Sequence, residues 1–338
     1  MKLSALGLTP WFKEKAGELA EPEQEIARVT IVDRGWYTIR NRNGELAARA
    51  TGKFMHAVKS ATDMPCVGDW VLVEYHALDN SASIHTLLPR RSFLRRKTAG
   101  KGIGFQMIAA NIDVAFIVQS CHYDFNVSRL ERYLVMASEG NVEPLIILTK
   151  TDLVCADELE RLISEIRAIG IHTRIIAISN LTGDGIDRLK EIMAPGKTYC
   201  VVGSSGVGKS TLINKLTGED KLRTGEVSES GEGKHTTVRR QLFVLKEGAM
   251  LIDTPGMREI GILHASEGLD ENFDDIRDLA LSCHFSNCGH TNEPRCAILK
   301  AIEEGKLLQE HLHDYLKLKK ESELNEKAYT NKRKKGKS

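Results

Sequence analysis

Residues 203–211 read Gly-Ser-Ser-Gly-Val-Gly-Lys-Ser-Thr, which matches the phosphate-loop pattern of a Gly, four residues and then Gly-Lys-Ser. The loop needs glycines because its backbone N–H groups must turn inward onto phosphate oxygens without a Cβ in the way. Lys209 adds a mobile positive charge for the β- and γ-phosphates, and Ser210 adds a hydroxyl for Mg²⁺. The predicted nucleotide-binding residues of the loop are Gly203, Ser204, Ser205, Gly206, Val207, Gly208, Lys209, Ser210 and Thr211.

The residues around this loop have the pattern that a phosphate site requires. Residues 197–203 form a short β-type run, and residues 209–217 carry apolar side chains at helical spacing. A strand, a glycine turn and a helix N-terminus in this order point backbone donors and the helix dipole at an anion. The context therefore favours a phosphate site over a chance glycine-rich turn.

Strand-like apolar runs alternate with helical patterns before and after the loop. The runs lie at residues 112–119, 143–148, 172–178, 240–245 and 250–252, and the helical patterns at 128–138, 156–168 and 185–193. This alternation predicts an α/β fold, with a parallel sheet of about six strands, helices on both faces and ligands at the carboxyl ends of the strands. A chain of 338 residues is too long for one such core, so further domains are expected.

A different pattern of short alternating strands and turn signals precedes this domain, from residue 26 to about residue 88. The strand patterns lie at residues 27–32, 35–40, 45–50 and 69–75. A stretch of about sixty residues suits a small closed barrel such as the oligonucleotide-binding (OB) barrel, although an SH3-like barrel would have a similar pattern. Trp36, Tyr37 and Phe54 either stack on bases or belong to the barrel core.

The apolar run before residue 149 ends in the sequence Thr149-Lys150-Thr151-Asp152, which resembles the guanine-reading Asn-Lys-x-Asp of GTPases. The Asp152 carboxylate can accept the N1–H and the 2-amino group of guanine together, a donor pair that adenine lacks, while Lys150 lies along the base plane. Thr149 departs from the usual Asn. At the end of the next strand, Ser179 occupies the place of a loop that contacts the base edge, although Asn replaces the usual Ala after it.

Two further motifs follow the phosphate loop: Gly-Lys-His-Thr-Thr, which ends at Thr237, and Asp-Thr-Pro-Gly, which begins at Asp253 and ends at Gly256. Asp253 would hold Mg²⁺ through water, and Gly256 would offer its N–H to the γ-phosphate. The first motif is polar, as expected of a switch segment that orders when γ-phosphate and Mg²⁺ are present. Thr237 is the predicted Mg²⁺-contacting threonine, with Thr236 as the adjacent alternative.

Near the C-terminus, Cys283, Cys288, His290 and Cys296 fall within fourteen residues, flanked by helical patterns. Three thiolates and one imidazole fill a tetrahedral Zn²⁺ site and leave no open position, so the predicted metal is structural. His284 competes as a ligand, but it adjoins Cys283 and has difficulty turning to the same ion. Removal of the metal should unfold these short helices.

The order of the motifs is unusual, because the base-reading motif precedes the phosphate loop by about fifty residues. In ordinary GTPases it follows the other motifs. The chain thereby resembles the circularly permuted RsgA (YjeQ) family of small-ribosomal-subunit-dependent GTPases. The resemblance extends to Val-Gly-Asp-Trp-Val at 67–71, Asp-Phe-Asn at 124–126, Arg-Tyr-Leu at 132–134, and the cysteine cluster.

The resemblance implies a GTPase that hydrolyses GTP to GDP and phosphate with Mg²⁺, acts in late maturation of the small ribosomal subunit, and is released after hydrolysis. It also implies contact of the barrel and the C-terminal part with ribosomal RNA. Met257 stands where many GTPases have a Gln that orients the attacking water. The family resemblance implies that His235 takes this catalytic role, and the alternative is that His235 is a solvated histidine of the switch segment. An RNA-binding scaffold and a P-loop ATPase remain the alternatives.

The expected organisation is an arm at 1–21, an OB barrel at 22–90, a basic linker at 91–108, a permuted GTPase domain at 109–262, a zinc-binding helical domain at 263–326 and a basic tail at 327–338. The net charge is only +1, but residues 90–101 and the last twelve residues are basic and contain no acid. They either meet a polyanion or form a solvated linker and tail.

The sequence predicts a cytoplasmic protein, with nothing to suggest more than a monomer. No apolar run approaches the roughly eighteen residues that a membrane helix needs, and the first residues lack a signal peptide pattern. The seven cysteines are an odd number, and four of them are scattered through apolar stretches, as expected of reduced thiols.

Overall fold

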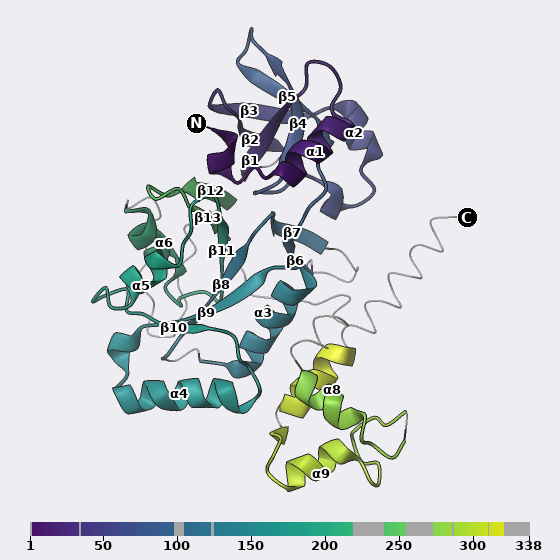
Figure 1. Cartoon of the computed structure of the whole chain (residues 1–338), viewed down its shortest axis with the longest axis vertical. Helices are drawn as coiled ribbons and strands as arrows, with labels where there is room; N and C mark the ends of the chain where they lie inside the picture. Colours follow the sequence, from purple (N-terminus) through teal and green to yellow (C-terminus); the bar gives the residue numbers. More distant parts are fainter. Residues whose placement is uncertain are drawn as a thin grey trace.

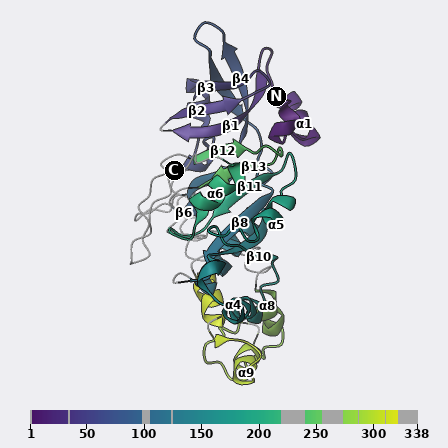
Figure 2. The same cartoon turned by 90° about the vertical axis from the view of Figure 1, so that its left-hand side faces the viewer.

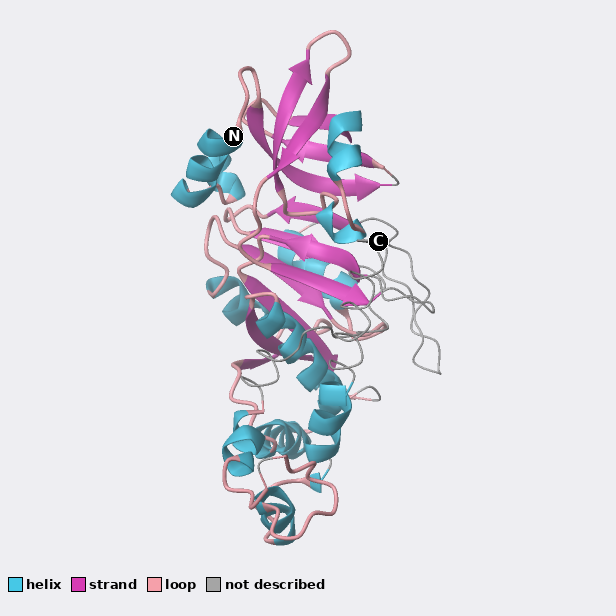
Figure 3. Ribbon diagram, turned by 90° about the vertical axis from the view of Figure 1, so that its right-hand side faces the viewer, coloured by secondary structure: helices cyan, strands magenta, loops and turns pink. Residues whose placement is uncertain are grey.

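The computed structural model describes residues 2–33, 35–97, 105–122, 125–218, 240–254, 273–285, 287–309 and 311–320. Figure 1 shows three layers along the long axis: a barrel at one end, an α/β sheet in the middle and C-terminal helices at the other end. The two side views in Figure 2 and Figure 3 show the same arrangement. No helix among the described residues is long and apolar enough to cross a lipid bilayer.

The barrel consists of β1 (Glu25–Asp33), β2 (Trp36–Arg40), β3 (Glu45–Ala50), β4 (Trp70–His76) and β5 (Ser81–Leu87). These strands lie in the order β1-β2-β3-β5-β4, and pairing of β1 with β4 closes the barrel. The β3–β5 pair is parallel and the other pairs are antiparallel. This order is that of an OB fold, so the OB prediction is confirmed and the SH3-like alternative is wrong.

The α/β sheet contains β8 (Val114–Ser120), β9 (Glu143–Thr149), β10 (Ile175–Ala177), β11 (Thr198–Val202), β12 (Arg240–Val244) and β13 (Met250–Asp253). Their order is β10-β9-β8-β11-β13-β12, and the first five of these strands are parallel. The edge strand β12 runs antiparallel to β13, where the sequence predicted a parallel sheet. Only a short turn with Gly248 at φ 86° joins the two strands, and a parallel pair needs a crossover of a dozen or more residues.

Helices cover both faces of this sheet, as the sequence predicted. They are α3 (Val127–Glu139), α4 (Ala156–Ala168), α5 (Ile186–Glu191) and α6 (Lys209–Thr217). Alternate side chains of β8 enter two separate cores. Ile117 packs in the core that includes Leu130 of α3, and Phe116 packs in the core that includes Leu212 of α6.

The barrel and the α/β sheet are joined by a backbone ladder and by one buried side chain. Antiparallel pairing of β1 with β12 makes a single eleven-stranded sheet of the described strands. Arg28 of β1 is 1% exposed and donates hydrogen bonds to all three parts that meet there. Its acceptors are Gly68 O in the barrel, Leu6 O in the N-terminal arm, and Asn111 O, Thr198 Oγ1 and Met250 Sδ in the α/β domain.

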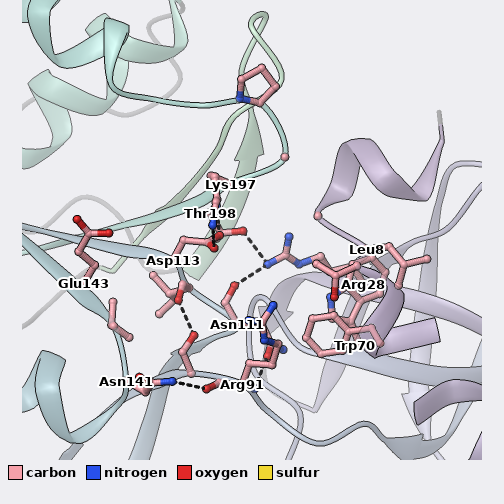
Figure 4. A pocket seen from close by; sticks show the side chains of 18 of the residues that line it. Leu8, Arg28, Trp70, Arg91, Asn111, Asp113, Asn141, Glu143, Lys197 and Thr198 are labelled. Carbon is pink, nitrogen blue, oxygen red and sulfur yellow. Dashed lines mark hydrogen bonds and ion pairs between the residues drawn. The ribbon is translucent and has the colours of Figure 1, made fainter. Parts of the chain in front are cut away.

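The N-terminal arm consists of η1 (Leu3–Leu6) and α1 (Pro10–Leu19), and its Phe12 is buried beside Trp70 of the barrel. Figure 4 shows the cleft of about 730 Å³ where the arm meets the two domains. Glu143 and Thr198, at the amino ends of β9 and β11, line this cleft. It therefore lies at the edge of the sheet opposite to the predicted nucleotide motifs.

The segment that the sequence indicates as a basic linker contains an antiparallel strand pair, β6 (Phe93–Lys97) and β7 (Phe105–Ala110). Leu94 in β6 is fully buried, so the pair belongs to the core. Two of its basic side chains have partners inside the fold: Arg90 bonds Asp69 of the barrel, and Arg95 bonds Glu139 of α3. These two arginines are structural, which removes them from the expected polyanion-binding cluster.

The C-terminal domain contains α8 (Asp274–Ala280), α9 (Ala297–Glu303) and a helix at 311–320. Its small core joins apolar residues of all three helices with one residue of α3. The contributor from α3 is Val135, which is fully buried there. Because these helices are short, this domain is packed against the α/β domain instead of standing alone.

Candidate functional site

The phosphate loop follows β11 and leads into α6, as the sequence predicted. Gly203 has φ 151°, and a Cβ added there would lie 2.3 Å from the carbonyl oxygen of Val118. Gly208 has φ 94°, and a Cβ there would lie 2.7 Å from Nδ2 of Asn180. Both positions require glycine, because φ is positive at each and a Cβ would collide with the Val118 carbonyl or with the Asn180 amide.

Lys209 begins α6, with Ser210 and Thr211 in the same first turn. The Lys209 Nζ donates a hydrogen bond to the backbone carbonyl of Ser204, across the mouth of the loop. Its ammonium group is therefore held at the position from which it can reach phosphate oxygens bound to the loop.

The base-reading residues are hydrogen-bonded to the phosphate loop. Thr149 is fully buried, and its Oγ1 donates to the carbonyl oxygen of Val207 over 2.6 Å. With Thr149 in place of the usual Asn, a direct hydrogen bond still joins this motif to the phosphate loop. Lys150 follows in a left-handed conformation, with φ 61°.

A buried serine orients the carboxylate of the base-reading motif. Ser179 is fully buried, and its Oγ donates to Oδ1 of Asp152 over 2.5 Å. The same Oγ accepts the backbone N–H groups of Leu181 and Thr182, each at 3.1 Å. These contacts hold the Asp152 carboxylate at the mouth of the site, where the side chain is exposed.

The sequence did not predict a role for Asn180, because this residue replaces the usual Ala of the loop that contacts the base edge. Its Nδ2 donates to the carbonyl oxygen of Gly208 over 3.0 Å, so it forms a second link between the base loop and the phosphate loop. The Asn residue type was the available signal, since a side-chain amide can bridge two backbone segments.

Asp253 ends β13 beside the phosphate loop and is 3% exposed. Its Oδ2 has no hydrogen-bond partner among the described residues. Burial raises the pKa of this carboxyl to about 6, although the positive charge of Lys209 opposes the shift. A buried carboxylate oxygen without a partner fits a group that receives a metal-bound water, which is the predicted relation to Mg²⁺.

The remaining predicted residues of the nucleotide site are His235, Thr237 with its alternative Thr236, Gly256 and Met257. All of them lie outside the described residues. Their roles stay predictions.

A candidate metal centre lies in the C-terminal domain, where one ligand atom from each of Cys283, Cys288, His290 and Cys296 falls within 4.8 Å of all the others. Cys283 Sγ lies 3.7 Å from His290 Nδ1 and 3.8 Å from Cys296 Sγ. Tetrahedral Zn²⁺ with ordinary bond lengths places S and N ligands about 3.6 Å apart and two S ligands about 3.8 Å apart. The four predicted residues therefore fit zinc, and His284 is not part of the cluster.

Backbone N–H groups form hydrogen bonds around the cluster. Although burial opposes it, hydrogen bonds from the N–H groups of Ala297 and Ile298 at the start of α9 hold the pKa of Cys283 below its ordinary value. Glu293 accepts the N–H groups of Thr291 and Gly289, which flank the ligand His290. The sequence does not single out Glu293, because a carboxylate that holds a loop has no signature in the spacing of the cluster residues.

Strand order and motif order together define the class of protein. The base-reading residues follow β9, the phosphate loop follows β11, and Asp253 ends β13, so all lie at the carboxyl edge of one sheet. The chain therefore has the architecture of a circularly permuted GTPase, with an OB barrel before the sheet and a Cys₃His helical domain after it.

Residues 87–263 match the family model described as RsgA GTPase. A small ribosomal subunit biogenesis GTPase RsgA 2 of Lactiplantibacillus plantarum is 42% identical over 302 residues, which cover 89% of this chain and 84% of that relative. Another, from Vibrio vulnificus, is 38% identical over 332 residues, which cover 98% of this chain and 91% of the relative. The chain belongs to the RsgA GTPase family.

Two solved structures have the same architecture. The crystal structure of YjeQ from Thermotoga maritima matches with a TM-score of 0.64 and 26% identity, over 87% of this chain and 97% of that chain. YloQ, described as a circularly permuted GTPase, matches with a TM-score of 0.58 and 23% identity, over 93% of this chain and 98% of that chain.

The buried Asp253 carboxylate predicts a stability cost in the nucleotide-free protein. Because its pKa is raised to about 6 from 3.8, its ionisation at neutral pH costs about 3 kcal/mol of folding free energy. Asp253→Asn should therefore raise the free energy of unfolding at pH 7, measured by urea denaturation without nucleotide. The exposed Asp157, replaced by Asn, is the control.

The sign of the pH dependence follows from proton linkage. Between pH 3.8 and about 6 the unfolded carboxylate ionises while the folded one stays protonated, so wild-type stability falls as pH rises. Above this window both states are ionised and the cost is constant. The gap between Asp253→Asn and wild type should open across this window, and a gap of equal size at pH 3.5 and pH 7 would contradict the assignment.

Proposed function

We propose that this chain is a ribosome-associated GTPase that hydrolyses GTP to GDP and phosphate in late maturation of the small ribosomal subunit and then leaves the subunit. The observation that carries the proposal is the Thr149–Val207 hydrogen bond, which ties the base-reading motif to the phosphate loop. The family is one of GTPases, and its named relatives are small ribosomal subunit biogenesis GTPases. Cytoplasmic location and a monomeric state accompany this proposal.

In the proposed site, Asp152 and Lys150 read guanine and the loop at residues 203–211 holds the phosphates. Water attacks the γ-phosphorus and the bond to the β–γ bridging oxygen breaks, so that phosphate and GDP form. Lys209 and the loop N–H groups stabilise the negative charge that spreads over the phosphoryl oxygens. Gly256 adds a further N–H to the γ-phosphate.

Ser210 and Thr237 would ligate Mg²⁺, and Asp253 would accept a hydrogen bond from one of its waters. When bound, the ion neutralises charge on the β- and γ-phosphates. Met257 cannot orient the attacking water through a hydrogen bond, so turnover by the protein alone is slow. His235 takes this role when the ribosomal partner is bound.

Ribosomal RNA is the proposed partner of the barrel. Trp36 is 47% exposed, and the guanidinium of Arg49 lies 3.4 Å from the centre of its ring. This stacked pair presents a flat, positively charged surface of the kind on which bases stack. Tyr37 is 4% exposed and belongs to the core, which leaves Trp36 as the accessible aromatic residue of this strand.

The cysteine cluster would hold one structural Zn²⁺ through Cys283, Cys288, His290 and Cys296. The closed set of four ligands supports a structural role, because no position remains for substrate. Loss of the γ-phosphate would move this domain relative to the barrel and weaken the hold on RNA.

Ribosome-dependent turnover tests the function directly. GTP hydrolysis should be slow for the protein alone and rise at least tenfold when purified small subunits are added, measured as phosphate release. Lys209→Ala should abolish the stimulated rate. The exposed Lys190, replaced by Ala, should leave it unchanged. A nucleotide-binding scaffold, in contrast, would show the same turnover with and without subunits.

Base recognition predicts a change of nucleotide preference. Asp152→Asn should weaken GTP binding by about a hundredfold, because the amide cannot accept both guanine donors. It should gain affinity for xanthosine triphosphate, whose 2-oxo group accepts the amide N–H. Titration with both nucleotides measures the change, and equal GTP affinity of this variant and wild type would remove Asp152 from the site.

Metal analysis tests the zinc centre. We expect one zinc per chain, and its removal by a chelator should unfold the C-terminal helices, seen as a loss of far-UV circular dichroism. Cys296→Ser should lose the metal. Cys155→Ser, at an exposed cysteine outside the cluster, should retain it. Full zinc content in the Cys296→Ser protein would contradict the ligand set.

A further inference from the structure

The first turn of α3 lies between the phosphate loop and the C-terminal domain. Ser128 and Glu131 contact the helix at 311–320, while Arg129 contacts the phosphate loop. Residues three apart share a helix face and the two residues between them point elsewhere, so one helical turn contacts both the phosphate loop and the C-terminal helix. Figure 1 and Figure 3 show α3 between the sheet and the C-terminal helices.

On the loop side, Nη1 of Arg129 donates to Oγ of Ser204 over 2.9 Å. Ser204 is the second residue of the phosphate loop, and its backbone carbonyl accepts the Lys209 Nζ. The side chains of Arg129 in α3 and Lys209 in α6 therefore both donate to Ser204. Hydrogen bonds from a charged donor are shorter and stronger than neutral ones, so Arg129 restrains the bend that sets the direction of Lys209.

On the C-terminal side, the contact is a hydrogen-bonded triad of Glu131, His311 and Asp275, of which the first two side chains are buried. His311 Nδ1 lies 2.6 Å from Oε1 of Glu131, and its Nε2 lies 3.2 Å from Oδ1 of Asp275 in α8. His311 and Glu131 are each 2% exposed, and Phe273 stacks on the imidazole ring. Burial opposes the charge of the imidazole, but bonds to the two carboxylates raise the pKa of His311 to about 9.

This triad fixes α3 to the C-terminal helices strongly, because breaking a buried ion pair leaves an uncompensated charge. A second hydrogen bond supports it, from Ser128 Oγ to Asp314 Oδ2 at 2.5 Å. The helix that carries Arg129 is therefore held by the C-terminal domain within two residues of Arg129 itself.

We infer that Arg129 is a positioning residue for the phosphate loop and that the C-terminal domain holds it in place through α3. Nucleotide binding then depends on the contact between Glu131 and His311, and the nucleotide state is sensed by the C-terminal domain through the same helix. This inference rests on the proposed nucleotide site and adds that Arg129 of α3 restrains the phosphate loop of that site.

The loop half of the inference is tested with full-length Arg129→Ala, Arg129→Lys, Ser204→Ala and the double variant Arg129→Ala/Ser204→Ala. Arg129→Ala should raise KM for GTP about tenfold with the unfolding midpoint preserved, and Lys should restore part of this. The double variant should lose less than the sum of the two single effects, because both changes remove the same Arg129–Ser204 hydrogen bond. Arg161→Ala, at an exposed ion pair of α4, is the control.

The domain half is tested with His311→Gln and its neighbour His313→Gln, which is 74% exposed. His311→Gln should weaken binding of a fluorescent GTP analogue several-fold, while His313→Gln should not. In the His311→Gln background, Arg129→Ala should have a smaller effect than in wild type. Zinc content reports whether the C-terminal domain is intact, and Ser128→Ala is the milder variant if His311→Gln loses its zinc.

Several outcomes would overturn the inference. One is a KM for GTP of Arg129→Ala within twofold of wild type, and another is a double variant whose effect equals the sum of the two single effects. A third is a His311→Gln protein that retains its zinc, binds the GTP analogue as wild type does, and shows the same effect of Arg129→Ala as wild type. Wild type that fails to bind GTP would instead contradict the proposed function. If wild type binds GTP and Arg129→Ala binds it equally well, only this inference would be overturned.

Discussion

The buried guanidinium of Arg28 is the interaction on which the arrangement of the molecule depends. Burial lowers its pKa to about 10, which still leaves it charged at neutral pH, and carbonyl, hydroxyl and sulfur acceptors surround it. A buried cation is stable only while its donors have partners, so the arm, barrel and α/β domain must stay together around it. The β1–β12 ladder adds backbone hydrogen bonds between the barrel and the α/β sheet.

At the opposite edge of the sheet, side-chain hydrogen bonds join motifs that are far apart in the sequence. Permutation places the base-reading motif on an earlier strand than the phosphate loop, yet Thr149 and Asn180 bond the loop carbonyls directly. The arrangement survives because the carboxyl ends of parallel strands share one edge whatever their order in the chain. The Oδ2 atom of Asp253 is buried at this edge without a described partner, which costs stability in the nucleotide-free protein and is typical of functional sites.

Local patterns predicted most of the fold and where the described candidate residues lie in it, while their roles stay predictions. The barrel, the alternating strands and helices, the phosphate loop and the zinc ligands each depend on residue type and spacing within a short stretch. The failures involve long-range partners. Arg90 and Arg95 were interpreted as part of a solvated or polyanion-binding linker, because a run of basic residues does not reveal that Asp69 and Glu139 fold against it. The antiparallel edge strand was missed because an apolar run indicates a strand but not its direction.

The sequence by itself predicted which residue types gather at the candidate sites. Glycine, lysine, cysteine and histidine at fixed spacing specify a phosphate loop and a tetrahedral metal set, since neighbouring residues bring these groups together in any fold that contains them. Only the tertiary structure decided which distant groups meet. Arg129 with Ser204, and Glu131 with His311, lie 75 and 180 residues apart in the chain, and no local periodicity encodes such pairs. Their contact arises from burial and packing of whole helices, which is a property of the complete folded chain.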